Sequence, residues 1–248
     1  MSDKDPSSST KPSIILLHGF RGSPLGLKEV ARIIREAGYE VFVPPIPPFS
    51  GATLPEYTPE AYVSYLHGFI DSHEIHQPIL IGHSMGSIVA AAVAHTEPDL
   101  IHEKLILLSP ISARTTRLVA PLVPLSAGLP RLVTDYVTTR FLFVPHDHKL
   151  FKEALKITNQ CSGDQVPRAR EVYASAKFSA QYSVADFPFE KDALFLAGES
   201  DRIVSKSNTE TLAKEIGAEL EFIPGSGHLH NYEKPQETAE AILRFLAK

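Results

Sequence analysis

One stretch, ILIGHSMGSIVAAAVA at residues 79–94, constrains the fold of this chain more than any other. Residues 78–81 are apolar and are followed by Gly82, which predicts a short strand buried on both faces, as in a parallel sheet. Residues 87–95 are small and apolar nearly all round, which predicts a buried helix. The strand must therefore turn into the helix at Gly82-His83-Ser84-Met85-Gly86.

The glycines around Ser84 fit such a turn. Gly82 and Gly86 carry no Cβ, so backbone segments can approach closely at both positions. We expect the hydroxyl of Ser84, at the tip of the turn, to lie clear of the sheet. A serine before a helix often serves only as its N-cap, but the buried strand and the two glycines favour a more specific role here.

Elsewhere along the chain, strand and helix patterns alternate. Short apolar runs predict strands at residues 13–18, 41–43, 79–81, 104–108, 193–197 and 219–223. Helical patterns with apolar faces lie around residues 27–37, 58–70, 207–216 and 239–246. The alternation predicts an α/β fold, with a doubly wound and mostly parallel sheet of about six strands covered by helices on both faces.

The alternation stops between residues 111 and 190. Helical patterns occur there around residues 132–137, 150–155 and 172–176, with prolines between them. We expect this stretch to be a helical cap, or lid, inserted into a core made of residues 13–110 and 191–248. Residues 1–12 are polar, which predicts a disordered tail and not a secretory signal.

Composition argues against several classes of function. The formal net charge is −5, which gives no indication of a nucleic-acid partner or of binding to an anionic membrane surface. No apolar run approaches the ~20 residues of a membrane span. Cys161 is the only cysteine, so an internal disulfide is impossible, and we expect a cytoplasmic protein. The sequence leaves the oligomeric state open.

A serine hydroxyl needs a nearby base to act as a nucleophile, and a third group to orient that base. In an open parallel sheet, reacting groups lie at the carboxyl ends of the strands. The predicted strand 193–197 is followed by Gly198-Glu199-Ser200-Asp201, and the strand 219–223 by Gly225-Ser226-Gly227-His228. The residues Ser84, Asp201 and His228 therefore follow each other in the order nucleophile, acid, base.

With these motifs the chain resembles the α/β-hydrolase family over residues 13–110 and 192–247. The motifs are HGF at 18–20, GHSMG at 82–86, GESD at 198–201 and GH at 227–228. The resemblance implies that Ser84 is the nucleophile, His228 the base and Asp201 the acid. It further implies an oxyanion hole made by the backbone N–H groups of Phe20 and Met85. Two antiparallel strands usual in the family have no room before residue 13, so we expect a shortened sheet.

Nearby residues compete for these roles. Glu199 is an alternative to Asp201 as the acid, and His230 is an alternative to His228 as the base. We favour Asp201 and His228 because the family's motifs place the acid and the base there. His230 is expected to be a surface or packing residue.

Other polar residues are expected to play supporting or solvated roles. His18 and His83 lie beside the predicted site, and we expect them to hydrogen-bond to nearby backbone groups. Arg21 is expected to be solvated. The segment His146-Asp147-His148 lacks a visible third ligand for a metal. Since a serine triad works with side chains and backbone alone, we expect no cofactor and no metal.

The resemblance implies a serine hydrolase that cleaves an ester or a related acyl bond through an acyl-serine intermediate. The insertion is rich in Leu, Val, Phe and Tyr, which favours a small, largely apolar substrate. Hydrolysis of a carbon–carbon bond in a β-diketone uses the same triad and stays open, as does a ligand-binding receptor that keeps the triad. Epoxide and haloalkane hydrolases are disfavoured, because they carry aspartate where Ser84 stands.

Overall fold

The computed structural model of the chain describes residues 11–115 and 167–248. Within them, six strands form one sheet in which every neighbouring pair is parallel, in the order β2-β1-β3-β4-β5-β6. The strands are β1 (Ile14–Leu17), β2 (Val41–Phe42), β3 (Ile79–His83), β4 (Lys104–Leu108), β5 (Asp192–Gly198) and β6 (Glu219–Ile223). The predicted α/β fold with a six-stranded sheet is confirmed.

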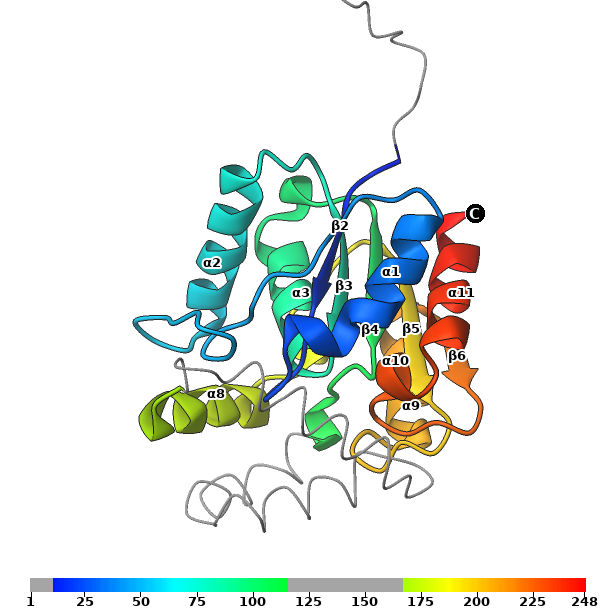
Figure 1. The fold of residues 1–248 in the computed structure, drawn as a ribbon. Helices are drawn as coiled ribbons and strands as arrows, with labels where there is room; N and C mark the ends of the chain where they lie inside the picture. The colour runs from blue at the N-terminus through cyan, green and yellow to red at the C-terminus, as the bar shows by residue number, and fades with distance from the viewer. Residues whose placement is uncertain (1–10, 116–166) are drawn as a thin grey trace, which may run out of the picture.

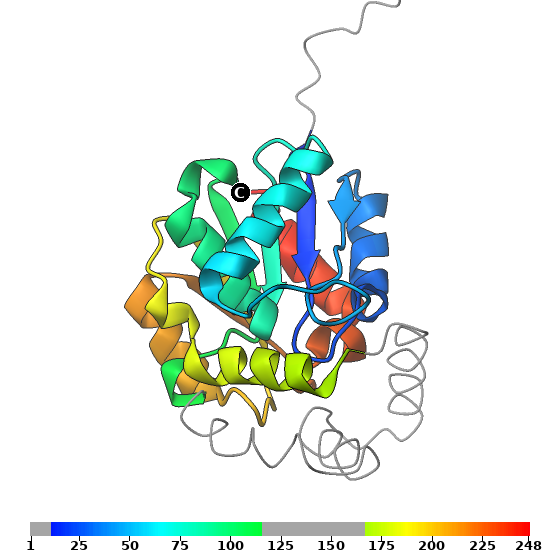
Figure 2. The same cartoon turned by 90° about the vertical axis from the view of Figure 1, so that its left-hand side faces the viewer.

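Helices cover both faces of the sheet (Figures 1 and 2). One face carries α1 (Lys28–Glu36) and α11 (Pro235–Leu246). The other face carries α2 (Pro59–Ser72), α3 (Met85–Thr96) and α9 (Lys206–Ile216). The remaining helical elements are α8 (Ala169–Gln181), α10 (His230–Glu233), η1 (Pro24–Leu27), η2 (Pro98–Leu100) and η4 (Val184–Asp186).

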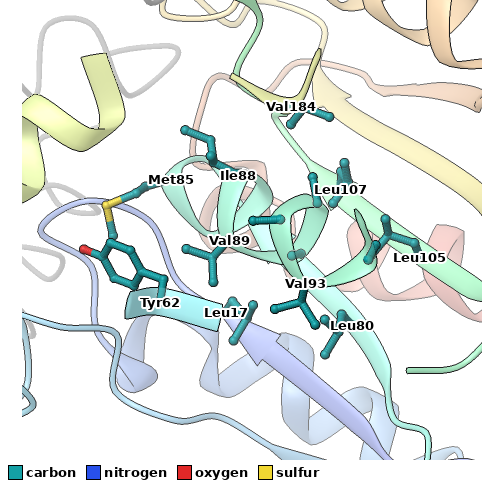
Figure 3. Packing of buried hydrophobic residues seen from close by; sticks show 14 of the residues in the cluster. Leu17, Tyr62, Leu80, Met85, Ile88, Val89, Val93, Leu105, Leu107 and Val184 are labelled. Carbon is teal, nitrogen blue, oxygen red and sulfur yellow. The ribbon is translucent and has the colours of Figure 1, made fainter. Parts of the chain in front are cut away.

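The strands are apolar on both faces because both faces are covered. In β1, Ile15 and Leu17 pack with α2 and α3, whereas Ile14 and Leu16 pack with α1 and α11. Figure 3 shows the first of these layers, in which apolar side chains of β1, β3 and β4 lie against α3. This two-sided burial is what a continuous apolar run in a strand predicts for a parallel sheet.

All strands run in the same direction, so their carboxyl ends meet at one edge of the sheet. Figures 1 and 2 show α8 lying across this edge. The helical pattern predicted around residues 172–176 is therefore confirmed as α8. The patterns at 132–137 and 150–155 lie outside the described residues, as do His146, His148, Cys161 and residues 1–10.

The stretch between β4 and β5 leaves and re-enters the core at neighbouring points. The backbone N–H of Val184 donates to the carbonyl oxygen of Ile111 over 2.9 Å. The N–H of Ile111 in turn donates to Ser87 Oγ, at 3.3 Å, near the start of α3. We call the Ile111–Val184 contact the neck of the predicted insertion.

Two helix ends carry residues that are typical of such positions. Thr58 precedes α2, and its side chain accepts a hydrogen bond from the N–H of Ala61. Gly217 follows α9 with a φ of 80°, which is a conformation that favours glycine. No helix in residues 11–115 and 167–248 is both long and apolar enough to cross a lipid bilayer.

Candidate active site

The turn between β3 and α3 is held in an uncommon conformation. Ser84 has a φ of 53° and a ψ of −117°, and such a residue costs about 1–3 kcal/mol of backbone strain. A Cβ on Gly82 would lie 2.3 Å from the carbonyl oxygen of Gly86, and a Cβ on Gly86 would lie 2.5 Å from that of Leu17. The N–H of Ser84 donates to the carbonyl of Leu108. Glycine is therefore required on both sides of Ser84.

The side chain of Ser84 makes no capping hydrogen bond to α3. Its Oγ lies 2.9 Å from Nε2 of His228 instead. On the other side of the ring, Nδ1 of His228 lies 2.8 Å from Oδ2 of Asp201. Since a carboxylate can only accept, Nδ1 carries the proton and Nε2 accepts from the serine hydroxyl. The three residues expected from the sequence are brought together from the loops after β3, β5 and β6.

Asp201 is buried, and hydrogen bonds satisfy its carboxylate. Oδ1 accepts from the backbone N–H groups of Ile203 and Val204, at 2.8 and 2.9 Å. Burial by itself would raise the pKa of Asp201, but the neighbouring His228 and the backbone hydrogen bonds outweigh burial, so that the pKa is lowered. Asp201 therefore stays ionised and can hold the His228 ring in one orientation.

The alternative acid, Glu199, lies elsewhere. Its side chain is exposed, and its Oε2 lies 3.5 Å from the backbone N–H of Gly225. Among the carboxylates of the described residues, Asp201 is the one that accepts a hydrogen bond from His228. The geometry thus favours Asp201 over Glu199.

Ser109, the first residue after β4, was not identified by the sequence analysis. It is fully buried with a φ of 44°, and its Oγ donates to Oδ2 of Asp201 over 2.9 Å. The same Oγ lies 3.4 Å from the carbonyl oxygen of His228. The available signal was a serine between an apolar strand and Pro110, at the edge of the sheet where the other site residues lie.

His18 and His83 bond to the backbone, as expected. Nε2 of His83 donates to the carbonyl of His228 over 2.9 Å. Nε2 of His18 accepts from the N–H of Ile46, and its Nδ1 donates to the carbonyl of Gly19, both at 2.9 Å. Burial lowers the pKa of His18 to about 4 and that of His83 well below its usual range, with His228 adding to the effect at His83. Both rings are therefore neutral and serve as fixed supports.

His230 is a packing residue and not a surface residue. It is fully buried, and its Nδ1 lies 3.1 Å from Oγ1 of Thr238 in α11. Burial lowers the pKa of His230 to about 4. The ring that faces Ser84 is that of His228, so the geometry favours His228 as the base.

Phe20 and Met85, the two residues expected to form the oxyanion hole, both lie beside Ser84. Met85 is the first residue of α3, so its N–H has no acceptor within the helix and lies at the positive end of the helix dipole. Phe20 follows Gly19, where an added Cβ would lie 2.9 Å from Cβ of Ser84, so the β1 loop passes directly beside the serine.

Helix α8 forms an apolar wall beside these two residues. Phe20 packs against Ala176 and Ala180 of α8. The Oγ of Ser175, also in α8, lies 3.4 Å from Sδ of Met85. Figure 3 shows that Met85 points toward the Tyr62 side chain, whose OH lies 3.4 Å from the same Ser175 Oγ. The end of the predicted insertion therefore contacts both oxyanion candidates.

Arg21 is half-buried, with its guanidinium carbon 5.8 Å from the centre of the Phe20 ring. Its expected solvation is thus only partial. In the ranges that the structure describes, no three His, Cys, Asp or Glu side chains are grouped so as to bind a metal ion. The groups that lie together at this site are a serine hydroxyl, a histidine ring and a buried carboxylate.

Comparison with known proteins relates the whole chain to hydrolases. A family model described as the alpha/beta hydrolase family matches residues 14–241. The uncharacterized hydrolase YugF of Bacillus subtilis is 22% identical over 95% of this chain and 90% of its own length. The sn-1-specific diacylglycerol lipase ABHD11 of Mus musculus is 24% identical over 96% of this chain and 82% of its own length.

A solved structure shows the same fold. A thermophilic esterase from Thermogutta terrifontis superposes with a TM-score of 0.79, over 96% of this chain and 90% of the esterase chain, at 22% identity.

Proposed function

Because the chain belongs to the alpha/beta hydrolase family, we propose that it is a serine hydrolase that cleaves an ester or related acyl bond of a small, largely apolar substrate. The observation that carries the proposal is the unbroken contact from Ser84 Oγ through the His228 ring to Asp201, at 2.9 and 2.8 Å. A nucleophile, its base and an orienting carboxylate in these contacts are what acyl transfer requires.

In the proposed reaction, Ser84 Oγ attacks the carbonyl carbon while its proton moves to Nε2 of His228. Asp201 keeps the proton of the ring on Nδ1 and stabilises the imidazolium that forms. The carbonyl oxygen becomes an oxyanion, which the N–H groups of Phe20 and Met85 stabilise by about 3 kcal/mol for each donor.

His228 then returns the proton to the leaving alcohol, and the acyl group stays on Ser84. A water molecule next attacks the acyl carbon and gives its proton to Nε2 of His228. The acid product leaves as Ser84 recovers its proton. Apart from the substrate and the attacking water, these steps use the chain's own side chains and backbone.

We propose that residues 111–190 form a cap that selects the substrate over the core of 13–110 and 191–248. The position of α8 supports this, because Ala176 and Ser175 contact Phe20 and Met85 beside the nucleophile. Phe20 also meets the ring of Phe49 edge-on, with ring centres 5.3 Å apart. These apolar contacts favour an acyl or aromatic group in the bound substrate.

The test uses p-nitrophenyl esters of increasing acyl length together with a fluorophosphonate probe. We expect turnover with a clear preference in acyl length, and one covalent adduct that mass spectrometry maps to Ser84. The variant Ser84→Ala should fold, form no adduct and lose on the order of 10⁶ in kcat. Ser72→Ala removes an exposed hydroxyl from α2 and should behave like the wild-type protein.

The outcomes separate the alternative functions. Undiminished ester hydrolysis by folded Ser84→Ala would overturn the serine mechanism. Adduct formation together with cleavage of a β-diketone, but not of esters, would assign the same triad to carbon–carbon hydrolysis. Adduct formation without turnover of either class would favour a ligand-binding receptor.

A further inference from the structure

Ser109 reaches the same carboxylate oxygen as the proposed catalytic base. Its Oγ donates to Oδ2 of Asp201 at 2.9 Å, and Nδ1 of His228 donates to that atom at 2.8 Å. Ser109 follows β4, which lies in the sheet between β3, which leads to Ser84, and β5, which leads to Asp201. Each of four neighbouring strands thus supplies one residue to one hydrogen-bonded group.

The carboxylate of Asp201 is fully occupied by this arrangement. A carboxylate offers about four lone-pair positions. The N–H groups of Ile203 and Val204 occupy Oδ1, while Ser109 and His228 occupy Oδ2. Donors on both oxygens prevent the carboxylate from rotating, so Oδ2 stays in line with Nδ1 of His228.

Resting on the proposed function, we infer that Ser109 is a positioning residue that fixes Asp201 and limits how strongly it holds the His228 ring. Ser109 and His228 donate to the same oxygen and share its negative charge. The hydrogen bond from Ser109 therefore weakens the one that Oδ2 accepts from His228. Without the hydroxyl, Asp201 would be less constrained and would bind the imidazolium more tightly. Ser109 touches neither the substrate nor the reacting atoms.

A second feature is that the backbone of Ser109 fixes the direction of its hydroxyl. Ser109 is fully buried and has a φ of 44°, in the left-handed region that favours glycine. Its backbone N–H donates to the carbonyl of Leu196 at 2.7 Å, which fixes the residue between β4 and β5. Its hydroxyl is thereby directed at Asp201, with the carbonyl of His228 at the longer distance of 3.4 Å.

The experiment compares Ser109→Ala with Ser13→Ala. Ser13 is half-buried just before β1, at the edge of the sheet opposite the site, and its Oγ donates to a carboxylate oxygen of Glu40 at 2.7 Å, so this control removes a serine–carboxylate hydrogen bond outside both the triad and the proposed cap. Ser109→Gly is the second test variant. It lacks the hydroxyl as well but tolerates the φ of 44°, so it separates loss of the hydrogen bond from backbone strain.

For both Ser109 variants we expect kcat on a p-nitrophenyl ester, and the rate of fluorophosphonate labelling, to fall about tenfold with KM unchanged, which is the usual worth of one hydrogen bond to a charged group. The acidic limb of the rate profile should move to higher pH. The low-field proton NMR signal of Nδ1–H of His228 should shift. Ser13→Ala should leave all five quantities as in the wild-type protein.

The failures can be told apart. If the wild-type protein is neither labelled nor active on any ester, the proposed function is wrong. If the wild-type protein is active and folded Ser109→Gly matches Ser13→Ala in rate, pH profile and NMR signal, Ser109 is a structural residue only. If both Ser109 variants lose activity with an unchanged pH profile and signal, the effect is general destabilisation, and the inference is equally overturned.

Discussion

Two histidine–carboxylate pairs in this protein have nearly the same length but very different surroundings. His228 and Asp201 lie 2.8 Å apart, with side chains that are 4% and 0% exposed. On the face of the sheet that carries α2 and α3, His67 of α2 lies 2.6 Å from Glu97, which follows α3. Their side chains are 44% and 31% exposed. The shorter contact is thus the one at the surface.

The second ring nitrogen makes the difference between these pairs. Nε2 of His228 faces the hydroxyl of Ser84, which leaves the nitrogen a lone pair with which to accept a proton. Nε2 of His67 faces a second carboxylate, Asp71, at 3.2 Å. The hydrogen bond to Glu97, aided by Asp71, raises the pKa of His67, so its ring tends to keep both protons. A histidine that contacts a carboxylate can therefore act as a base only where its other ring nitrogen is left to accept a proton.

Replacing each histidine tests this contrast with the largest expected difference. His228→Ala removes the base and should lower kcat on a p-nitrophenyl ester by on the order of 10⁶. His67→Ala should leave kcat unchanged, because its ring is directed at two surface carboxylates. Equal activity of the two variants would break the comparison.

Replacing the carboxylates gives a smaller difference. Asp201→Asn keeps the shape of the side chain, but its amide favours the wrong tautomer of the His228 ring. We therefore expect a loss of about 10⁴ in kcat. Glu97→Gln is the matched change in the surface pair and should leave kcat as it is. A folded Asp201→Asn variant with wild-type kcat would show that the carboxylate does not orient the base.

Buried and exposed histidines should also differ in how pH affects stability. The pKa values of His18 and His230 are about 4 in the folded protein, below the value of about 6.5 for an unfolded chain. Between these values the unfolded chain binds more protons, so stability falls as the pH falls from about 6.5 to 4.

Each of these two histidines should contribute up to about 3 kcal/mol to that loss. Urea unfolding at a series of pH values measures it. His230→Gln cannot titrate, so its stability should fall less steeply over the same range. An identical slope for His230→Gln and the wild-type protein would contradict the neutral state of the buried ring.

The smallest expected effect has the opposite sign. The pKa of His67 is raised in the folded protein, so its stabilising effect is present below the unfolded value of about 6.5 and is lost as the pH rises through the folded pKa. Because the pair is exposed and screened by salt, the effect should be slight and should shrink further in high salt. His67→Ala, compared with the wild-type protein at pH 5 and pH 9, measures it.

The sequence predicted the elements that repeat a strong local pattern. The spacing of Gly82 and Gly86 around Ser84 identified the turn, because only glycine fits backbone contacts as close as those observed. The strand itself was predicted to end at Ile81. It continues to His83, which pairs with Leu108, because a strand between two neighbours keeps its hydrogen bonds through a glycine.

Contacts between distant segments could not be predicted in the same way. Ser109 is one serine in an ordinary setting, and only the order of strands in the sheet brings it to Asp201. His67 and Glu97 are separated by 30 residues on two helices, and no periodicity relates them. His230 was expected to be a surface or packing residue, and its burial depends on where α11 packs.

The neck at Ile111 and Val184 has a consequence for how this protein can change over time. The core closes on itself there through one backbone hydrogen bond, so the ends of the intervening chain are held together whatever its length. Doubling the length of a loop costs only about 0.6 kcal/mol in closure entropy. If this segment selects the substrate, as proposed above, evolution or a protein engineer can lengthen, shorten or exchange parts of it and so change the range of accepted molecules, while Ser84 and His228 keep their places.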